Sequence, residues 1–214
     1  MQLGGHALVA DDHPLTREGL ALAIRAAAPG IALDNVGSIA EAERAIATRK
    51  GGYRLLLLDF VLPDARGFSG FLQLQHLLAA TPIVVISARA EPVIIEAARA
   101  LGAAGFVSKS SALDALAASL RLIFAGQRVF PPAHGANPAA QSLRDRIATL
   151  SGAQLRVLLA LADGRLNKQI ADSLAITEAT VKAHLTVIFR KLGVDNRAQA
   201  LLAVQPLLAE TAAP

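Results

Sequence analysis

Leu55-Leu56-Leu57-Leu58-Asp59 is the most informative stretch of the chain. Four apolar residues in a row predict a strand that is buried on both faces, as strands inside a parallel sheet are. The run ends on a carboxylate, and in an open α/β sheet ligands bind at the carboxyl ends of the strands. Taken alone, Asp59 is more often a turn residue that bonds loop amides, so the residues around it have to decide its role.

Four further apolar runs alternate with helical segments in the first 125 residues. We expect strands near 7–10, 31–36, 55–59, 83–87 and 106–107, and helices near 15–28, 38–50, 69–78, 91–101 and 112–125. Strands that are joined by helical crossovers must be parallel. Residues 5–125 are therefore predicted to form a doubly wound, five-stranded parallel α/β domain of the flavodoxin-like kind. No glycine-rich phosphate loop follows the first strand, so any pocket is built from side chains.

Charged and hydroxyl side chains follow four of these strands. They are Asp11 and Asp12 after the first strand, Asp59 after the third, Ser87 after the fourth and Lys109 after the fifth. Each close pair of carboxylates costs about 4 kcal/mol at an effective dielectric constant of about 20, so the cluster calls for a cation. Oxygen ligands favour a hard ion, and Mg²⁺ is the expected cofactor. A divalent ion and a lysine beside one carboxylate suit phosphoryl transfer onto Asp59.

The composition indicates a soluble intracellular protein, and the length allows one large domain or two small ones. The 214 residues are 53% hydrophobic and include no cysteine, which excludes disulfides, thiolate metal sites and a cysteine nucleophile. No apolar run reaches the ~18–20 residues of a membrane span, and the N-terminus lacks the features of a signal peptide. We therefore expect a cytoplasmic protein with no membrane partner.

The net charge is distributed unevenly along the chain. Residues 1–125 carry eleven basic and eleven acidic side chains, whereas residues 126–214 carry ten and six, so the whole net charge of +4 lies in the second part. We expect this basic second part of the chain to bind a polyanion. Residues 126–142 hold three of the ten prolines and are predicted to be a linker.

Residues 143–209 are helical by pattern and are predicted to form a four-helix domain. A short helix at 167–174, a turn at 175–177 and a longer helix at 178–192 form a helix-turn-helix arrangement. In the longer helix, Val181, Leu185, Ile188 and Leu192 recur at helical spacing and predict the core side. The opposite face is small and mixed, so it can enter a major groove ~12 Å wide, although an ordinary solvated face would explain the same pattern.

The residues expected at DNA fall into two groups. Lys182 and Thr186 are expected to reach base edges, and Ala183 or Val187 to touch a thymine methyl group. Those placed better for phosphates are Lys168, His184, Arg190, Lys191 and Arg197. Thr177 and Thr180, at the start of the longer helix, complete the predicted interface.

Residues 5–125 resemble the receiver domain of two-component response regulators. Besides the strand-end cluster, the resemblance rests on Pro63, on Gly67 and on the segment Leu101-Gly-Ala-Ala-Gly-Phe-Val-Ser-Lys109. It implies that Asp59 is the phosphoacceptor. The implied Mg²⁺ ligands are Asp12, Asp59 and the Val61 backbone carbonyl, with help from Asp11, and the implied phosphoryl-binding and switch residues are Ser87, Phe106 and Lys109.

The second part is similar to LuxR-type DNA-binding domains. The similarity rests on Asn167-Lys-Gln-Ile-Ala-Asp-Ser-Leu-Ala-Ile-Thr-Glu-Ala-Thr-Val-Lys-Ala-His184 and on Lys191-Leu-Gly-Val-Asp-Asn-Arg197. The whole chain thus resembles a response regulator of the NarL/FixJ type. This resemblance implies a bacterial transcription factor, not an enzyme beyond slow self-dephosphorylation. A cognate sensor histidine kinase would phosphorylate it, and it would bind operator DNA as a homodimer when phosphorylated.

The chain departs from the pattern of the family at three places, one of them a pair of residues. Ser110 follows Lys109 where most receivers have proline, and Phe106 stands where many have tyrosine, so it is either the switch aromatic or a core residue. Ala153-Gln154 replaces the usual Arg-Glu pair, so we expect that a polar tie within the second domain is missing.

Three other functions remain open from the sequence. A metal-dependent phosphatase would use Asp59 as its nucleophile, but Val61 occupies the position at which such enzymes usually carry the acid. A phosphorylation-independent DNA-binding regulator would keep the first domain only for dimerisation, and the intact acidic cluster argues against it. A receptor for a diffusible ligand would need an enclosed apolar pocket in place of that cluster.

Overall fold

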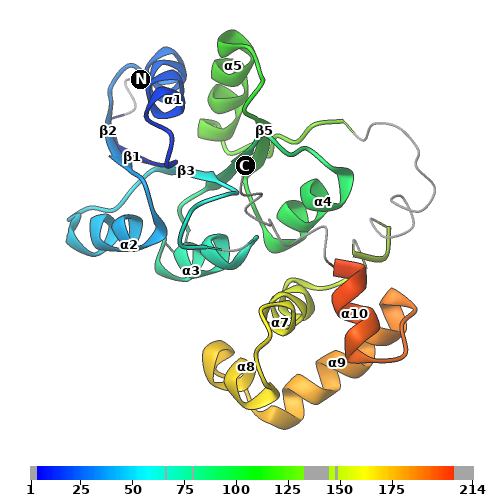
Figure 1. The fold of residues 1–214 in the computed structure, drawn as a ribbon. Coiled ribbons are helices and arrows are strands. Elements are labelled where there is room, and N and C mark those ends of the chain that lie inside the picture. Colours follow the sequence, from blue (N-terminus) through cyan, green and yellow to red (C-terminus); the bar gives the residue numbers. More distant parts are fainter. Residues whose placement is uncertain (1–3, 66, 79, 133–144, 148, 205–214) are drawn as a thin grey trace. The chain divides into compact units, whose positions relative to one another are not determined.

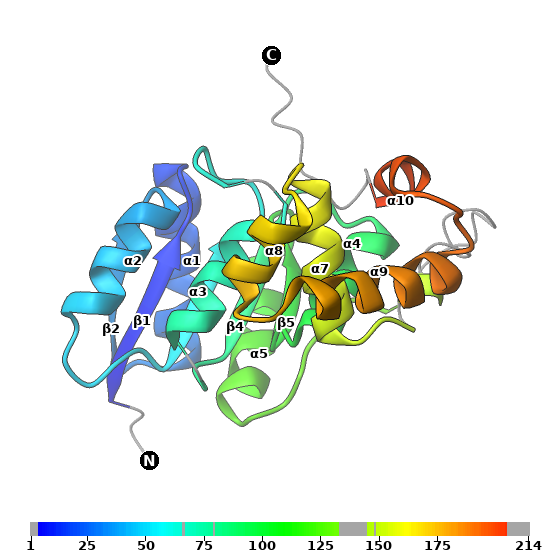
Figure 2. The same cartoon turned by 90° about the horizontal axis from the view of Figure 1, so that it is seen from below.

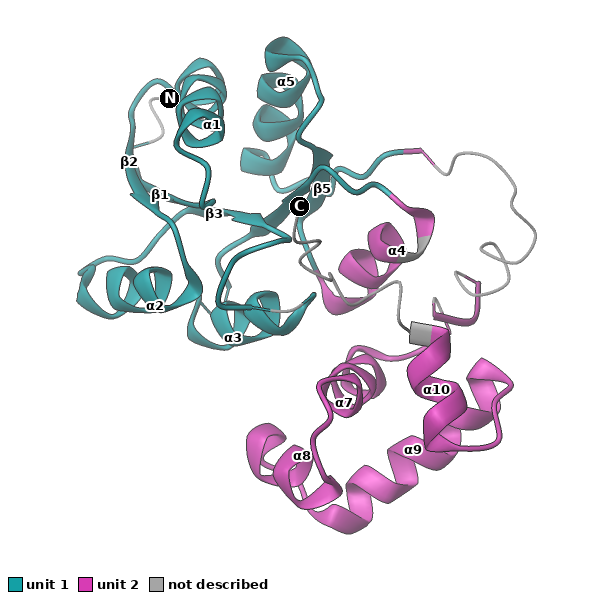
Figure 3. Cartoon of the chain, viewed as in Figure 1, with its two compact units in different colours: residues 1–90, 103–131, 211–214 teal, residues 91–102, 132–210 magenta. Residues whose placement is uncertain are grey.

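The computed structural model describes residues 4–65, 67–78, 80–132, 145–147 and 149–204. By its contacts the chain divides into two compact units, which are described separately (Figure 3). The first unit holds the residues up to 90 together with 103–131, and the second holds 91–102 and the part from 132 onward. None of the described helices is long and apolar enough to cross a membrane.

The first unit is built on a five-stranded parallel sheet with the strand order β2-β1-β3-β4-β5 (Figure 1). The strands are β1 (Gly5–Ala10), β2 (Ile31–Val36), β3 (Leu55–Asp59), β4 (Ile83–Ser87) and β5 (Gly105–Ser108). All residues of β3 and β4 are buried, as expected for central strands that are covered on both faces. The predicted flavodoxin-like sheet is confirmed.

Helices cover both faces of this sheet. They are α1 (Pro14–Ala27), α2 (Ile39–Thr48), α3 (Ser69–Leu78) and α5 (Leu113–Phe124). Figure 1 shows α1 and α5 on one face and α2 and α3 on the other, and Figure 2 shows α2 and α3 side by side. Alternate strand residues, such as Val9, Leu57 and Ile86, pack with Ile24 of α1 and Leu120 of α5 in the core.

The register of the strands brings the polar strand ends together. Ala10 of β1 pairs with Leu58 of β3. The residues that follow them, Asp11 and Asp59, therefore lie next to each other. Ser87 directly follows Ile86, which is the partner of Asp59 in β4. Ser87 in turn pairs with Ser108, the residue before Lys109. The convergence predicted from the sequence is therefore a consequence of parallel hydrogen bonding.

Helix α2 ends two residues earlier than predicted. Its last residue is Thr48, because Arg49 takes an extended backbone conformation. The Arg49 guanidinium lies 2.5 Å from a carboxylate oxygen of Asp34 on the edge strand β2 and 5.3 Å from the centre of the Tyr53 ring. An ion pair and a cation–π contact thus replace the last half-turn of the helix.

The chain returns to the edge of the sheet after α5. Val129 forms an isolated parallel bridge with Gly105; its amide donates to the Ala104 carbonyl at 3.0 Å, and its carbonyl accepts from the Phe106 amide at 2.9 Å. The first residues of the range that we expected to be a linker therefore lie along β5. Residues 133–142 of that range are outside the described part of the chain.

Gly105 is required by this close approach. A Cβ atom at position 105 would lie 2.7 Å from the Val129 carbonyl oxygen, whereas a Cβ at Gly19 in α1 would meet nothing within 4 Å. We expect Gly105→Ala to lower the free energy of unfolding by about 1–3 kcal/mol, as overpacking does, and Gly19→Ala to raise it by about 0.5–1 kcal/mol. Urea denaturation measures both; a neutral Gly105→Ala would show that Val129 is not tightly paired.

The second unit is helical, and residues 145–147 are helical in addition to its longer helices. The longer helices are α4 (Pro92–Leu101), α7 (Gly152–Ala162), α8 (Asn167–Leu174), α9 (Glu178–Leu192) and α10 (Arg197–Val204). Helices α8 and α9 span the residues predicted for them, and Ala175 turns the chain between them in a left-handed conformation with φ 51°. Residues 143, 144, 148 and 205–209 of the predicted domain lie outside the described residues.

Candidate functional sites

Within the described residues, three polar or charged side chains are buried, and all three lie at the carboxyl edge of the sheet. Asp11 is 0% exposed, Asp59 5% and Ser87 1%. Removing carboxylates from water is unfavourable unless a partner compensates their charge. The burial of these groups is therefore not explained by stability and indicates a functional site at this edge of the sheet.

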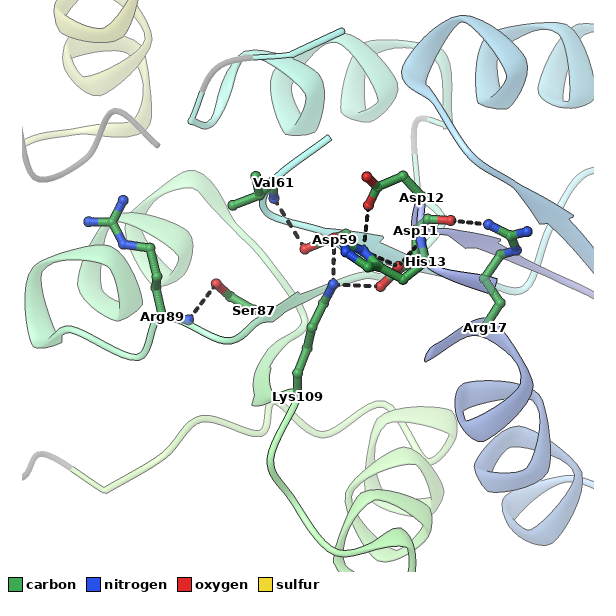
Figure 4. Close-up of polar contacts among 9 residues, drawn as sticks. All are labelled: Asp11, Asp12, His13, Arg17, Asp59, Val61, Ser87, Arg89 and Lys109. Atoms are coloured by element: carbon green, nitrogen blue, oxygen red, sulfur yellow. Dashed lines mark hydrogen bonds and ion pairs between the residues drawn. The ribbon is translucent and has the colours of Figure 1, made fainter. Parts of the chain in front are cut away.

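Lys109 is the cation that the buried carboxylates share (Figure 4). Its Nζ lies 2.6 Å from Asp59 Oδ2 and 2.8 Å from Asp11 Oδ2. The other carboxylate oxygen of Asp59, Oδ1, accepts a hydrogen bond from the Val61 amide at 3.1 Å. The Lys109 amide donates to the Ser87 carbonyl at 2.8 Å, which ties the lysine to the end of β4.

One ammonium between two carboxylates leaves a negative charge without compensation. Burial raises the pKa of the Asp59 carboxyl, and the hydrogen bond and charge of Lys109 oppose this only in part. Burial tends to lower the pKa of Lys109, but the two carboxylates outweigh it and the pKa is raised. Because the pKa of Asp59 is higher folded than unfolded, its contribution to stability is present below the ordinary carboxyl pKa and is lost as the pH rises through the raised value.

The same edge offers ligands for a cation. Ligand atoms of Asp11, Asp12, His13 and Asp59 all lie within 4.8 Å of one another, and the Asp12 side chain is 37% exposed. Three carboxylates provide the oxygen ligands that Mg²⁺ takes, together with a surplus of negative charge, so these residues fit that ion. The Val61 carbonyl, two residues after Asp59, is the backbone ligand that the sequence resemblance implies.

Sequence reasoning missed His13 and Arg17 at this edge. His13 Nδ1 lies 2.7 Å from Asp12 Oδ1, and the His13 amide donates to Asp11 Oδ1 at 2.8 Å. The Arg17 guanidinium donates to the Asp11 carbonyl at 2.6 Å. The position of His13 directly after two aspartates was the available signal; Arg17, one helical turn further on, gave none.

The two predicted switch residues are placed differently. The Ser87 hydroxyl accepts a hydrogen bond from the Arg89 amide at 2.9 Å, so it is held within its own loop. Phe106 is 1% exposed and part of the core of its unit. The bond between Lys109 and Ser110 is trans, as is every peptide bond in the described residues.

Helix α9 has the two faces predicted for it. Val181, Leu185, Ile188 and Leu192 are buried, which confirms the core stripe. Of the residues predicted at DNA, those that are exposed are Lys168, Thr177, Lys182, Ala183, Thr186 and Arg190, while Thr180 and His184 are half-buried. The Thr177 hydroxyl accepts from the Thr180 amide at 3.1 Å and so caps the helix.

Two of the predicted phosphate contacts have partners inside the unit. Lys191 Nζ donates to the Thr149 carbonyl at 2.6 Å and to Gln154 Oε1 at 2.9 Å. The Arg197 guanidinium donates to the carbonyl oxygens of Arg165 at 2.8 Å and Leu161 at 3.3 Å. These cations tie α9 and α10 to the end regions of α7; their contact with DNA stays a prediction.

The expectation that a polar tie is missing at Gln154 is wrong. Its Oε1 accepts from Lys191 and also from the Ser151 amide at 3.1 Å, within a capping box at the start of α7. Gln154 is thus a neutral acceptor for the Lys191 ammonium.

Restoring the carboxylate should strengthen this tie. We expect Gln154→Glu to raise the free energy of unfolding by about 0.5–1 kcal/mol, because the acceptor then bears a charge opposite to Lys191 and lies at a helix N-terminus. Gln154→Ala, the matched control, should lower it. Scanning calorimetry of the full chain measures both, and the gain should shrink at about 1 M salt. A destabilising Gln154→Glu would contradict the arrangement described.

Two family models match the chain. The response regulator receiver domain matches residues 7–121, and the luxR family of bacterial regulatory proteins matches residues 148–204. The chain is 32% identical to the glycerol metabolism activator of Pseudomonas putida over 91% of this chain and 92% of that protein. It is 31% identical to the probable transcriptional regulatory protein NarL of Mycobacterium tuberculosis (strain H37Rv), over 91% and 90%.

Solved structures show the same fold. RcsB from Salmonella enterica serovar Typhimurium, bound to the promoter rprA in the presence of phosphomimetic BeF3-, matches with a TM-score of 0.57 at 21% identity, over 94% of this chain and 98% of that one. A structure of two RcsB dimers bound to two parallel DNAs matches with a TM-score of 0.56, also at 21% identity. At this identity the comparison carries the fold alone.

The chain belongs to the response regulators that join a receiver domain to a LuxR-type DNA-binding domain. It is a transcriptional regulator, and the family is not one of classical enzymes. Receiver domains generally use Mg²⁺ at an acidic pocket, and this chain has an aspartate cluster at the carboxyl edge of its sheet.

Proposed function

We propose that Asp59 accepts a phosphoryl group from a cognate sensor histidine kinase and that this modification controls binding of operator DNA through α9. The observation that carries the proposal is the ammonium of Lys109 between Asp59 and Asp11, two buried carboxylates, at 2.6 and 2.8 Å. Such a buried and incompletely neutralised nucleophile is costly to keep and suits a reaction that adds a group there.

The reaction follows from the positions of these groups. A carboxylate oxygen of Asp59 attacks the phosphorus of a phosphohistidine; the P–N bond breaks, its electron pair goes to the imidazole, and that imidazole takes up a proton. Lys109 lies close enough to neutralise charge on the transferred group. Asp11, Asp12, Asp59 and the Val61 carbonyl would hold Mg²⁺, which supplies further neutralisation of the phosphoryl oxygens. The resulting acyl phosphate would be hydrolysed slowly at the same site.

The new charge acts on the end of β5. A phosphoryl group adds about −1.5 to −2 charges, so Lys109 and the Ser87 hydroxyl turn toward it, and Ser87 gives up the Arg89 amide. Phe106 lies three residues before Lys109 and lacks a hydroxyl, so it responds by packing alone. The changed surface of the receiver, residues 5–125, then favours a homodimer whose domains at 143–209 bind half-sites about one turn apart. Because the proposed protein receives phosphate from a kinase and binds operator DNA, it would act in the cytoplasm.

Removing the nucleophile tests the first step. We expect Asp59→Asn to abolish incorporation of phosphate from a small phosphodonor such as acetyl phosphate, and with it the phosphate-dependent gain in operator affinity. Asp114→Asn, which alters an acidic residue in the first turn of α5, is the control and should behave as the wild type. Full phosphate-dependent operator affinity in Asp59→Asn would refute the proposal in favour of a regulator that uses its receiver only for dimerisation.

Two lysines distinguish base reading from phosphate contact. Lys182→Ala should abolish the preference for operator over random DNA, because this exposed side chain is predicted at base edges. Lys168→Ala should weaken binding to both DNAs equally and reduce the salt slope by about 1. Gel-shift titrations at several salt concentrations measure both effects, and phosphorylation should stay intact. Unchanged operator binding in Lys182→Ala would show that this face of α9 is assigned wrongly.

A further inference from the structure

The loop between β3 and α3 carries a carboxylate that does not belong to the strand-end cluster. Asp64 Oδ1 accepts a hydrogen bond from the Ile39 amide at 2.9 Å, and Asp64 Oδ2 accepts one from the Ala40 amide at 3.0 Å. Ile39 is the first residue of α2. One exposed side chain thus binds the first two free amides of a helix that precedes it by about 25 residues in the sequence.

Helix α2 has a cap of its own, so Asp64 is an additional one. The Ser38 hydroxyl accepts from the Glu41 amide at 3.2 Å, and the Glu41 carboxylate accepts from the Gly37 amide at 2.7 Å. The helix therefore starts correctly by local contacts alone. The distinct effect of Asp64 is on the loop that bears it, because a negative charge at a helix N-terminus is held firmly.

The first half of that loop, residues 60–64, is held at two points. The Phe60 amide donates to the Ile86 carbonyl at 2.8 Å, and the Asp64 carboxylate is bound to α2. Leu62, which is 2% exposed, is the apolar contact in the middle. Val61 thus lies between two points that are held by hydrogen bonds, Phe60 and Asp64.

We propose that Asp64 is a positioning residue for the cation site: its two hydrogen bonds to α2 hold the loop so that the Val61 carbonyl faces the carboxylates of Asp11, Asp12 and Asp59. The inference rests on the proposed function, because it assigns a role toward the Mg²⁺ that phosphorylation requires. Groups that orient the ligands of a metal typically change its affinity by about 10–100-fold when they are removed. Asp64 acts on one backbone ligand of several, so the lower end of that range is expected.

The test compares Asp64→Ala with Ser38→Ala in the full chain. Both variants remove hydrogen-bond acceptors from the N-terminus of α2, but only Asp64→Ala releases the loop. We expect Asp64→Ala to raise the Mg²⁺ concentration for half-maximal phosphorylation by acetyl phosphate about tenfold, with the rate at saturating Mg²⁺ nearly unchanged. Ser38→Ala should leave this concentration as in the wild type. Asp64→Asn, which retains one acceptor oxygen, should lie between the two.

A second readout does not depend on phosphorylation. In Mg²⁺-free protein, hydrogen exchange of the Val61 amide should become faster in Asp64→Ala and stay unchanged in Ser38→Ala. Equal Mg²⁺ dependence in wild type and Asp64→Ala would overturn the inference, and so would equal losses in Asp64→Ala and Ser38→Ala, since the effect would then come from α2. A wild-type chain that neither binds Mg²⁺ nor takes up phosphate would overturn the proposed function itself.

Discussion

The structure depends on one ammonium group that is shared by two buried carboxylates. Lys109 Nζ lies within 2.8 Å of both Asp59 and Asp11, and Ser87 is the one other buried polar side chain among the described residues. The three charges do not cancel, and the raised pKa of Asp59 is the consequence. A divalent ion, of the kind that receiver domains generally use, would offset this surplus negative charge better than a monovalent one.

Strand β5, which directly precedes Lys109, also pairs with a residue that follows α5. β5 has four residues, and its last residue is followed by Lys109 of the cluster. On the side away from β4, the Phe106 amide donates to the Val129 carbonyl. Gly105 makes that pairing possible because it has no side chain in the way of the Val129 carbonyl. The acidic cluster and the first residues after α5 are thus joined by a single short strand. In the second unit, hydrogen bonds also join separate elements: Lys191 connects α9 to the start of α7, and Arg197 connects α10 to the residues after α7.

Much of the fold and of the acidic cluster follows from the sequence, because both depend on periodic patterns. The apolar run of β3 and the crossovers around it define the sheet, and parallel register then brings Asp11, Asp59 and Lys109 together. Contacts between single polar side chains have no such pattern. The capping of α2 by Asp64, across about 25 residues, could not be predicted. The hydrogen bond from Lys191 to Gln154 was not foreseen either, because the sequence indicated that a polar tie was missing there.

Unfolding experiments at different Mg²⁺ concentrations test the central claim most directly. The surplus charge should make Asp59→Asn more stable than the wild type at pH 7 without Mg²⁺. Added Mg²⁺ should then stabilise the wild type by about 2.7 kcal/mol at a hundred times its dissociation constant, and should stabilise Asp59→Asn far less. A wild type that is more stable than Asp59→Asn without Mg²⁺, and whose stability does not change when Mg²⁺ is added, would contradict the account.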